Sequence, residues 1–261
     1  MIYGTLFALI TVGMIVLCQP TRVIFFVTCA LIAAHEMRKA LEKCGYHPLA
    51  WPVMTLCVSS TLLLYFGKAG YVFPVFMIIM IALFGQMILG GKTSVKDVLS
   101  TLAVCAYPVS PLLLMVYISV NDAIWAAVFL NSIVPAIVSD TFALFGGRRF
   151  GKHKLSPHIS PHKTVEGLLC GLACGTLSGF AVYGILHAFG RGVIPMWAVI
   201  VAALASALAG ALGDLAASSV KRAAQIKDYS HLIPGHGGML DRVDSALFAI
   251  PVCYMIYALF V

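Results

Sequence analysis

The sequence predicts an all-α, polytopic integral membrane protein with about nine transmembrane helices. Of its 261 residues, 61% are hydrophobic and only 10% are charged, whereas an average soluble domain carries about 25% charged residues. The apolar residues form long continuous runs, and a membrane-spanning helix needs about 20 of them. The Lys and Arg residues fall mainly in short segments between these runs, as expected for a membrane protein.

Nine apolar runs are the candidate spans. The weakest is 23–40, because His35, Glu36 and Arg38 crowd its end. The first run lacks a basic leader and a small-residue cleavage site, which favours a retained helix over a signal peptide. The runs are 2–18, 23–40, 49–66, 71–89, 95–120, 123–145, 165–189, 193–217 and 243–261.

The basic residues predict the orientation. Alternating loops place fourteen of the 17 Lys and Arg residues on one side and only Arg22, Lys68 and Arg191 on the other. Because positive loops stay inside, the N-terminus is expected to be cytoplasmic. A net charge of +7 is also typical of nucleic-acid binding, but short basic loops favour a membrane protein and no nucleic-acid partner.

Two stripes of small residues predict close helix packing. One recurs every four residues, and a second follows in the next run, where such residues let helix backbones approach each other. This packing would hold the neighbouring polar loops rigid. The stripes are Gly167, Gly171, Gly175 and Gly179, then Ala202, Ser206, Gly210 and Gly213.

The chain divides by the content of its loops. Residues 1–120 are expected to form a scaffold of membrane helices with candidate dimer contacts. Residues 121–261 are expected to form the catalytic membrane domain, with two cytoplasmic polar loops at 146–164 and 218–242.

Four carboxylates mark a candidate metal site. Asp140 and Asp214 lie in the cytoplasmic ends of apolar runs, where a charged group costs about 3 kcal/mol or more and is a functional candidate. An ion pair between helices is a serious alternative for Asp140. Asp241 and Asp244 are three residues apart and share a helix face. We expect Asp214, Asp241 and Asp244 to converge on Mg²⁺, which binds carboxylate oxygens together with substrate phosphates.

Basic residues and glycine turns near these acids indicate phosphate binding. Exposed amides in a glycine turn before a helix form an anion site, and cations nearby would complete it, so the pattern indicates phosphoryl or nucleotidyl transfer. For the second segment, an ordinary basic loop on anionic lipid is the alternative. The residues are Lys221, Arg222, Lys227, His236, Gly237, Gly238 and Arg242, and in the second segment Ser160, Lys163 and Thr164.

The run from Ser218 to Asp244 contains SSVKR, KD and PGHGGMLDRVD, and it closely resembles the signature of the phosphatidate cytidylyltransferases. Asp140-Thr141 and the SPHKTVEG segment resemble the second motif of this family. The resemblance covers roughly the last half of the chain. Three positions depart from the usual family pattern, with Ala217 for Glu, Ser230 for Gly and His162 for Lys.

The resemblance implies an enzyme of the cell membrane whose active site faces the cytoplasm. It would convert CTP and phosphatidate to CDP-diacylglycerol and pyrophosphate, require Mg²⁺ and form a homodimer, with a monovalent cation such as K⁺ as an option. Asp214, Asp241 and Asp244 would be the metal-site acids. Ser218 would join the basic residues in gripping phosphate.

Two alternatives remain. A CTP-dependent polyprenol or lipid kinase, or another lipid cytidylyltransferase, could use a similar site and would be distinguished by its products. An ion-coupled transporter is more remote, because the charges gather at one surface rather than at mid-bilayer.

Overall fold

The computed structural model describes residues 18–91, 93–120, 124–190, 194–232 and 237–260. The chain divides into two compact units. Unit 1 comprises Met1–Asn121 and Val220–Arg242, and unit 2 comprises Asp122–Ser219 and Val243–Val261. Two of the three boundaries fall within helix α9, Met196–Ala223, and helix α10, Leu240–Phe260.

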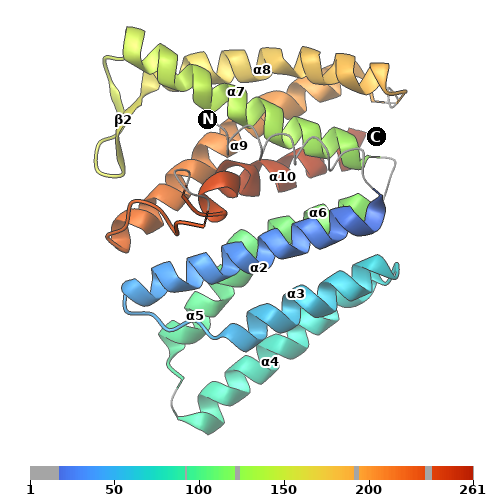
Figure 1. The fold of residues 1–261 in the computed structure, drawn as a ribbon, viewed down its shortest axis with the longest axis vertical. Helices are drawn as coiled ribbons and strands as arrows, with labels where there is room; N and C mark the ends of the chain where they lie inside the picture. Colours follow the sequence, from blue (N-terminus) through green and yellow to red (C-terminus); the bar gives the residue numbers. More distant parts are fainter. Residues whose placement is uncertain (1–17, 92, 121–123, 191–193, 233–236, 261) are drawn as a thin grey trace. The chain divides into compact units, whose positions relative to one another are not determined.

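Unit 1 is built from helices. They are α2 Gln19–Lys43, α3 Ala50–Tyr65, the 3₁₀ turn η1 Ala69–Tyr71, α4 Val72–Gly90, α5 Val95–Val104, the π-helical segment η2 Cys105–Val109 and α6 Ser110–Val120. Helix α2 packs against α6, and α3 packs against α4 (Figure 1). The π-helical turn contains Pro108, which lacks the N–H that a regular helix needs.

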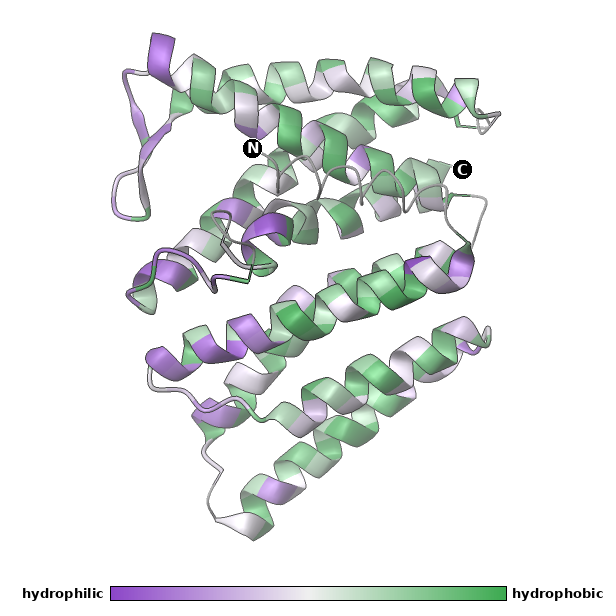
Figure 2. Ribbon diagram, in the orientation of Figure 1, coloured by the Kyte–Doolittle hydropathy of each residue, from purple (hydrophilic) through white to green (hydrophobic). Residues whose placement is uncertain are grey.

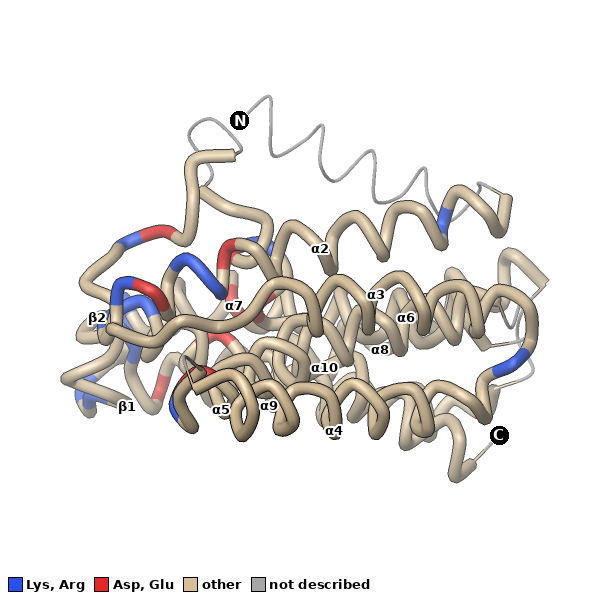
Figure 3. The backbone as a smooth tube through the Cα atoms, turned by 90° about the horizontal axis from the view of Figure 1, so that it is seen from below, with Lys and Arg blue, Asp and Glu red and all other residues tan. Residues whose placement is uncertain are grey.

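Helix α2 is long, with charges near its two ends and none in its middle (Figure 3). Its middle buries small residues such as Ala30, Ala33 and Ala34, which permit close contact with neighbouring helices. Near its start, buried Arg22 donates through Nη2 to the carbonyl oxygen of Ser119 on α6 at 3.2 Å. The start of α2, which carries Arg22, is therefore held by its contact with α6.

Unit 2 contains α7 Trp125–Phe150, strands β1 Lys154–Ser156 and β2 Ser160–Thr164, and α8 Val165–Ala188, with most of α9 and α10. Helices α7 and α8 lie side by side, and the β hairpin joins them at one end (Figure 1). The strands are antiparallel, with Lys154 opposite Thr164 and Ser156 opposite Ser160. The hairpin and the adjoining end of α7 are hydrophilic, whereas the middle of α7 and α8 is mostly apolar (Figure 2).

The glycine stripe of α8 forms a packing surface, as the sequence predicts. A Cβ atom added at Gly171 would lie 2.5 Å from the carbonyl oxygen of Ser139 on α7. A Cβ at Gly179 would lie 2.9 Å from Ala203 Cβ on α9. Gly210 of the second stripe lies similarly close to Ala136 of α7. Only a hydrogen side chain allows these backbones to approach so closely.

The predicted all-α membrane class is confirmed. Among the described residues, six helices are long and apolar enough to cross a membrane. Helices also occupy the runs predicted at 23–40 and 49–66, whereas 2–18 lies outside the described residues. The total of nine spans and the cytoplasmic N-terminus stay predictions. The six candidate spans are Ala69–Gly90, Val95–Val120, Trp125–Phe150, Val165–Ala188, Met196–Ala223 and Leu240–Phe260.

Two helices extend beyond the predicted apolar runs. Helix α7 continues to Phe150 and α9 to Ala223, so the first residues of the predicted loops 146–164 and 218–242 are helical. Both helices carry two basic residues in the last turn. Cations there interact favourably with the helix dipole, so the helix persists after its apolar stretch ends. The division into scaffold and catalytic halves stays a prediction.

Candidate functional site

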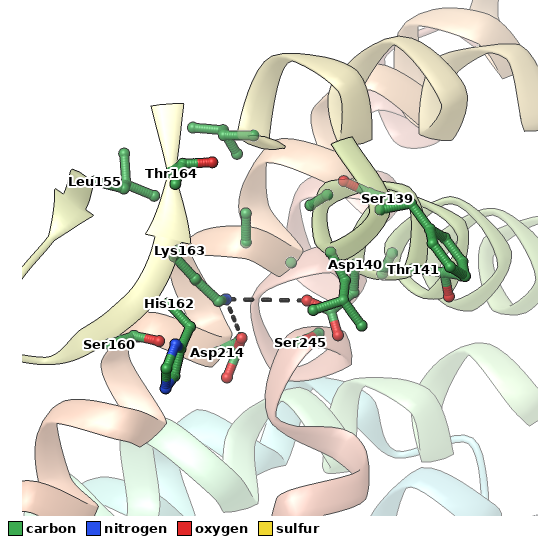
Figure 4. Close-up of a pocket in the computed structure, with 17 residues that line it drawn as sticks. Ser139, Asp140, Thr141, Leu155, Ser160, His162, Lys163, Thr164, Asp214 and Ser245 are labelled. Carbon is green, nitrogen blue, oxygen red and sulfur yellow. Dashed lines mark hydrogen bonds and ion pairs between the residues drawn. The ribbon is translucent and has the colours of Figure 1, made fainter. Parts of the chain in front are cut away.

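Unit 2 contains a cluster of two carboxylates and one ammonium group. Lys163 on β2 is hydrogen-bonded through Nζ to Oδ2 of Asp214 on α9. The same Nζ lies 3.9 Å from Oδ1 of Asp140 on α7. Figure 4 shows the Lys163 side chain pointing toward both aspartates. The structure therefore brings together three predicted site residues from three different elements.

The hairpin fixes the direction of Lys163. The next residue, Thr164, is the N-cap of α8, and its Oγ1 accepts a hydrogen bond from the backbone N–H of Gly167 at 3.1 Å. Thr164 is buried, and its side chain fills the space beside Gly147. Because successive strand residues point to opposite faces, capping by Thr164 directs Lys163 toward the aspartates. Thr164 thus has a structural role as the cap of α8. Its role in phosphate binding stays a prediction.

The cluster lines a pocket of about 440 Å³. One part of the lining is polar and the other is apolar. The cluster is accessible, because the Asp140 side chain is 64% exposed and those of Lys163 and Asp214 are 26% and 21% exposed. The polar lining includes Ser160, His162 and Ser245 with the three cluster residues, and the apolar lining includes Leu144, Phe145, Leu155 and Leu168 (Figure 4).

The donor set of this pocket suits a hard cation with phosphate. Two carboxylates and one ammonium leave a net negative charge, and Ser218 Oγ lies 3.4 Å from Asp214 Oδ1. Among the described residues, no group of three His, Cys, Asp or Glu side chains could hold a metal by itself. Two carboxylates can hold a hard cation such as Mg²⁺ only when water or substrate phosphate completes its shell.

A second carboxylate–lysine pair lies in unit 1. Asp241, in the first turn of α10, accepts from Lys221 Nζ at 2.7 Å through Oδ1. Its Oδ2 accepts from the backbone N–H groups of Tyr229 at 2.8 Å and Gly238 at 3.0 Å. The side chain of Asp241 is only 5% exposed. Oδ2 thus binds the backbone of the loop that precedes α10, while Oδ1 binds the ammonium group of Lys221.

The glycine turn before α10 depends on close contacts. Gly237 has φ +80°, a left-handed conformation that glycine adopts without strain. A Cβ at Gly238 would lie 2.6 Å from Oε1 of Glu36. Glu36 accepts from the backbone N–H groups of Met239 and Leu240. The sequence pattern does not identify Glu36 as a site residue, because its partners lie about 200 residues away in the chain.

The other predicted site residues differ in how deeply they are buried. Asp244 is buried and its Oδ1 accepts from the backbone N–H of Ser245 at 2.7 Å. Arg222, Lys227 and Arg242 are exposed. His236 lies outside the described residues.

Convergence of the three predicted metal acids stays a prediction. Asp214 and Asp244 belong to unit 2, and Asp241 belongs to unit 1. Each unit positions its own carboxylates through the contacts described above.

Comparison with known proteins identifies relatives with named activities. A phosphatidate cytidylyltransferase of Bacillus subtilis (strain 168) is 41% identical over 130 residues, 47% of this chain and 44% of that protein. One of Brucella abortus (strain 2308) is 41% identical over 133 residues, 51% and 47% of the two chains. One of Haemophilus influenzae is 36% identical over 144 residues, 55% and 45%.

The matched part is less than half the length of each of these curated relatives. A family model described as the cytidylyltransferase family matches residues 1–260. Since that match extends over nearly the whole sequence, the chain belongs to the cytidylyltransferase family.

Proposed function

We propose that this protein transfers the cytidylyl group of CTP to phosphatidate, forming CDP-diacylglycerol and releasing pyrophosphate. Membership of the family and the named activity of the relatives support this reaction. The observation that carries it is Lys163 between Asp140 and Asp214, in a pocket with polar and apolar lining. That pocket offers ligands for a cation and a phosphate beside a surface suited to a lipid.

The main obstacle to this reaction is charge. A phosphate oxygen of the lipid attacks the α-phosphorus of CTP, and both reactants are anionic. An ammonium group has three N–H donors, so Lys163 can contact a phosphate oxygen while it still neutralises a carboxylate. Fixed cations in such a site stabilise the charge that develops on the leaving pyrophosphate. In unit 1, Lys221 offers further N–H donors, whereas the Gly238 amide already donates to Asp241.

Mg²⁺ is part of this proposal. Asp214 is its proposed ligand in this pocket, Asp140 is a further candidate, and the metal role of Asp241 and Asp244 stays a prediction. When bound, the ion would neutralise phosphate charge and polarise the phosphorus–oxygen bonds. Asp214 is suited to this role because its Oδ1 is held by Ser218 at 3.4 Å and its Oδ2 by a displaceable lysine. A K⁺ ion beside the magnesium belongs to the same proposal.

The setting of the reaction follows from the two substrates. The acyl chains of phosphatidate stay in the bilayer, while CTP is water-soluble, so a shared site must lie at the membrane rim. Asp140, Lys163 and Asp214 line one pocket of unit 2, and the end of α7 that joins the β hairpin is hydrophilic (Figure 2). We place this rim at the cytoplasmic face of the cell membrane and propose that the protein is a homodimer.

The test uses purified protein in lipid nanodiscs with phosphatidate, Mg²⁺ and CTP labelled at the α-phosphate. We expect label in the lipid phase and one pyrophosphate released per lipid product. Lys163→Ala should lower this turnover strongly, whereas Lys154→Ala, an exposed lysine on the paired strand, should not. Formation of CDP with a phosphorylated lipid would identify a kinase instead, and no turnover with phosphatidate would refute the proposal.

A further inference from the structure

Glu36 is a buried carboxylate that the proposed chemistry does not use. It lies on α2, and it is 3% exposed. Its Oε1 accepts from Ser230 Oγ at 2.5 Å and from the backbone N–H of Met239 at 3.0 Å. Its Oε2 accepts from the backbone N–H of Leu240 at 2.7 Å. A buried charge is costly unless it is hydrogen-bonded, and all of these bonds go to the segment that leads into α10.

These bonds give α10 a cap from another helix. The first N–H groups of a helix have no partner within it, and α10 begins at Leu240. The carboxylate of Glu36 accepts from two of the N–H groups at this end. Its negative charge is also favourable beside the positive end of the helix dipole. Glu36 therefore fixes where α10 starts, one residue before Asp241.

Asp241, which lies in the first turn of α10, binds the same segment. Its Oδ2 accepts from the N–H of Gly238, and the next two N–H groups, of Met239 and Leu240, donate to Glu36. Three successive amides are thus held by two carboxylates. A Cβ atom at Gly238 would lie 2.6 Å from Oε1 of Glu36, so a larger residue there would displace the Glu36 carboxylate.

This arrangement leaves one oxygen of Asp241 for chemistry. Its Oδ2 is occupied by the turn, and its Oδ1 faces Lys221 at 2.7 Å. Where Oδ1 lies depends on where the first turn of α10 lies, and that depends on Glu36. Groups that orient a ligand in this way commonly change metal affinity or activity by about 10-fold to 100-fold when they are removed.

We infer that Glu36 is a positioning residue: it anchors the start of α10 and thereby holds the Asp241 carboxylate in its working position. The inference rests on the proposed function for its consequence in turnover, but the anchor itself is a contact within unit 1. The two parts can therefore be tested separately.

The first measurement is amide hydrogen exchange of the whole protein in detergent, by mass spectrometry. Glu36→Gln keeps the shape of the side chain but replaces one acceptor oxygen by an amino group that cannot accept. We expect the amides of Met239 and Leu240 to exchange about tenfold faster in this variant, with no change in peptides from α3 and α4. Unchanged exchange at these two amides would overturn the anchor, whatever reaction the protein catalyses.

The second measurement is turnover as a function of Mg²⁺ concentration. For Glu36→Gln we expect kcat to fall about 10-fold to 100-fold and the half-saturating Mg²⁺ concentration to rise, with the KM for phosphatidate unchanged. A role in stability alone would reduce the active fraction and leave the Mg²⁺ dependence unaltered, and that result would overturn the positioning role. If the wild-type protein forms no CDP-lipid, the proposed function fails while the exchange experiment still decides the anchor.

Two further variants serve as controls. Glu42→Gln changes an exposed glutamate of the same helix that pairs with Arg38 at 3.5 Å, and it should leave exchange and turnover as in the wild type. Ser230→Ala removes one of the three bonds that described residues donate to Glu36 and should give a smaller effect of the same kind. An effect of Glu42→Gln as large as that of Glu36→Gln would overturn the inference.

Discussion

Replacing Gly171 with alanine tests the packing that holds the pocket of unit 2 together. The added Cβ would lie 2.5 Å from the carbonyl oxygen of Ser139 and 2.9 Å from Ala143 Cβ, both on α7. The first of these neighbours is backbone, so it cannot rotate away. The two helices must separate by several tenths of an ångström or more, and Asp140 follows Ser139 directly on the helix that moves.

The expected cost follows from two opposing terms. Alanine in a helix interior gains about 0.5–1 kcal/mol over glycine, whereas overpacking a closely packed contact costs about 1–3 kcal/mol. Separation would also loosen the contacts at Gly167 and Gly175, where added Cβ atoms would lie 2.6 Å and 2.9 Å from α7 carbonyl oxygens. We therefore expect Gly171→Ala to lower the free energy of unfolding by about 1–2 kcal/mol.

Gly184 provides a matched control on the same helix, since a Cβ added there meets nothing within 4 Å. Gly184→Ala should leave stability unchanged or raise it by up to about 1 kcal/mol. Thermal unfolding of the purified protein in mild detergent compares the two variants, with turnover measured alongside. If Gly171→Ala proves as stable as Gly184→Ala, the close approach of α7 and α8 is refuted.

The remaining predictions concern the site. Asp214→Asn and Asp241→Asn should each lower turnover about a hundredfold or more in protein that still elutes as a folded species from size exclusion; an active variant would contradict the metal role. Thr164→Ala should lose about 1 kcal/mol of stability because the N-cap of α8 is removed, whereas Thr164→Ser should retain it in thermal unfolding. Excess chelator should abolish CDP-lipid formation and added Mg²⁺ should restore it; turnover in excess chelator would exclude the metal.

Hydropathy predicts where the helices lie better than where they end. The run predicted at 123–145 corresponds to α7, which ends at Phe150, and the run at 193–217 corresponds to α9, which ends at Ala223. Hydropathy reports where a helix leaves the apolar phase, whereas the end of a helix depends on backbone hydrogen bonds and on charges in its last turn. Apolar runs alone therefore do not predict the polar helix ends that carry Arg148–Arg149 and Lys221–Arg222.

The candidate site could be predicted in its residue types but not in its pairings. Spacing within one helix predicts neighbours such as Asp214 and Ser218, which are in contact at 3.4 Å. The approach of Lys163 to Asp214 depends on the β hairpin and on the packing of α8, which no local pattern specifies. Glu36 is the clearest example of an unpredicted pairing. The sequence alone shows it as a charge that weakens a predicted span, and only the fold shows which groups it binds.

In both clusters a carboxylate is paired with a lysine rather than an arginine. This difference determines how easily the positive charge can move. Lys163 pairs with Asp214 in unit 2, and Lys221 pairs with Asp241 in unit 1. An ammonium on a flexible four-carbon stem can move from one anion to another by rotation about side-chain bonds, whereas a guanidinium binds carboxylates through a rigid, two-pronged geometry. In each cluster a lysine can thus neutralise the acids before substrate binds and turn to phosphate afterwards, with no change in the backbone. In the proposed reaction, the carboxylate that it leaves would be free for a cation, and phosphate oxygens would complete the ligand shell of that cation.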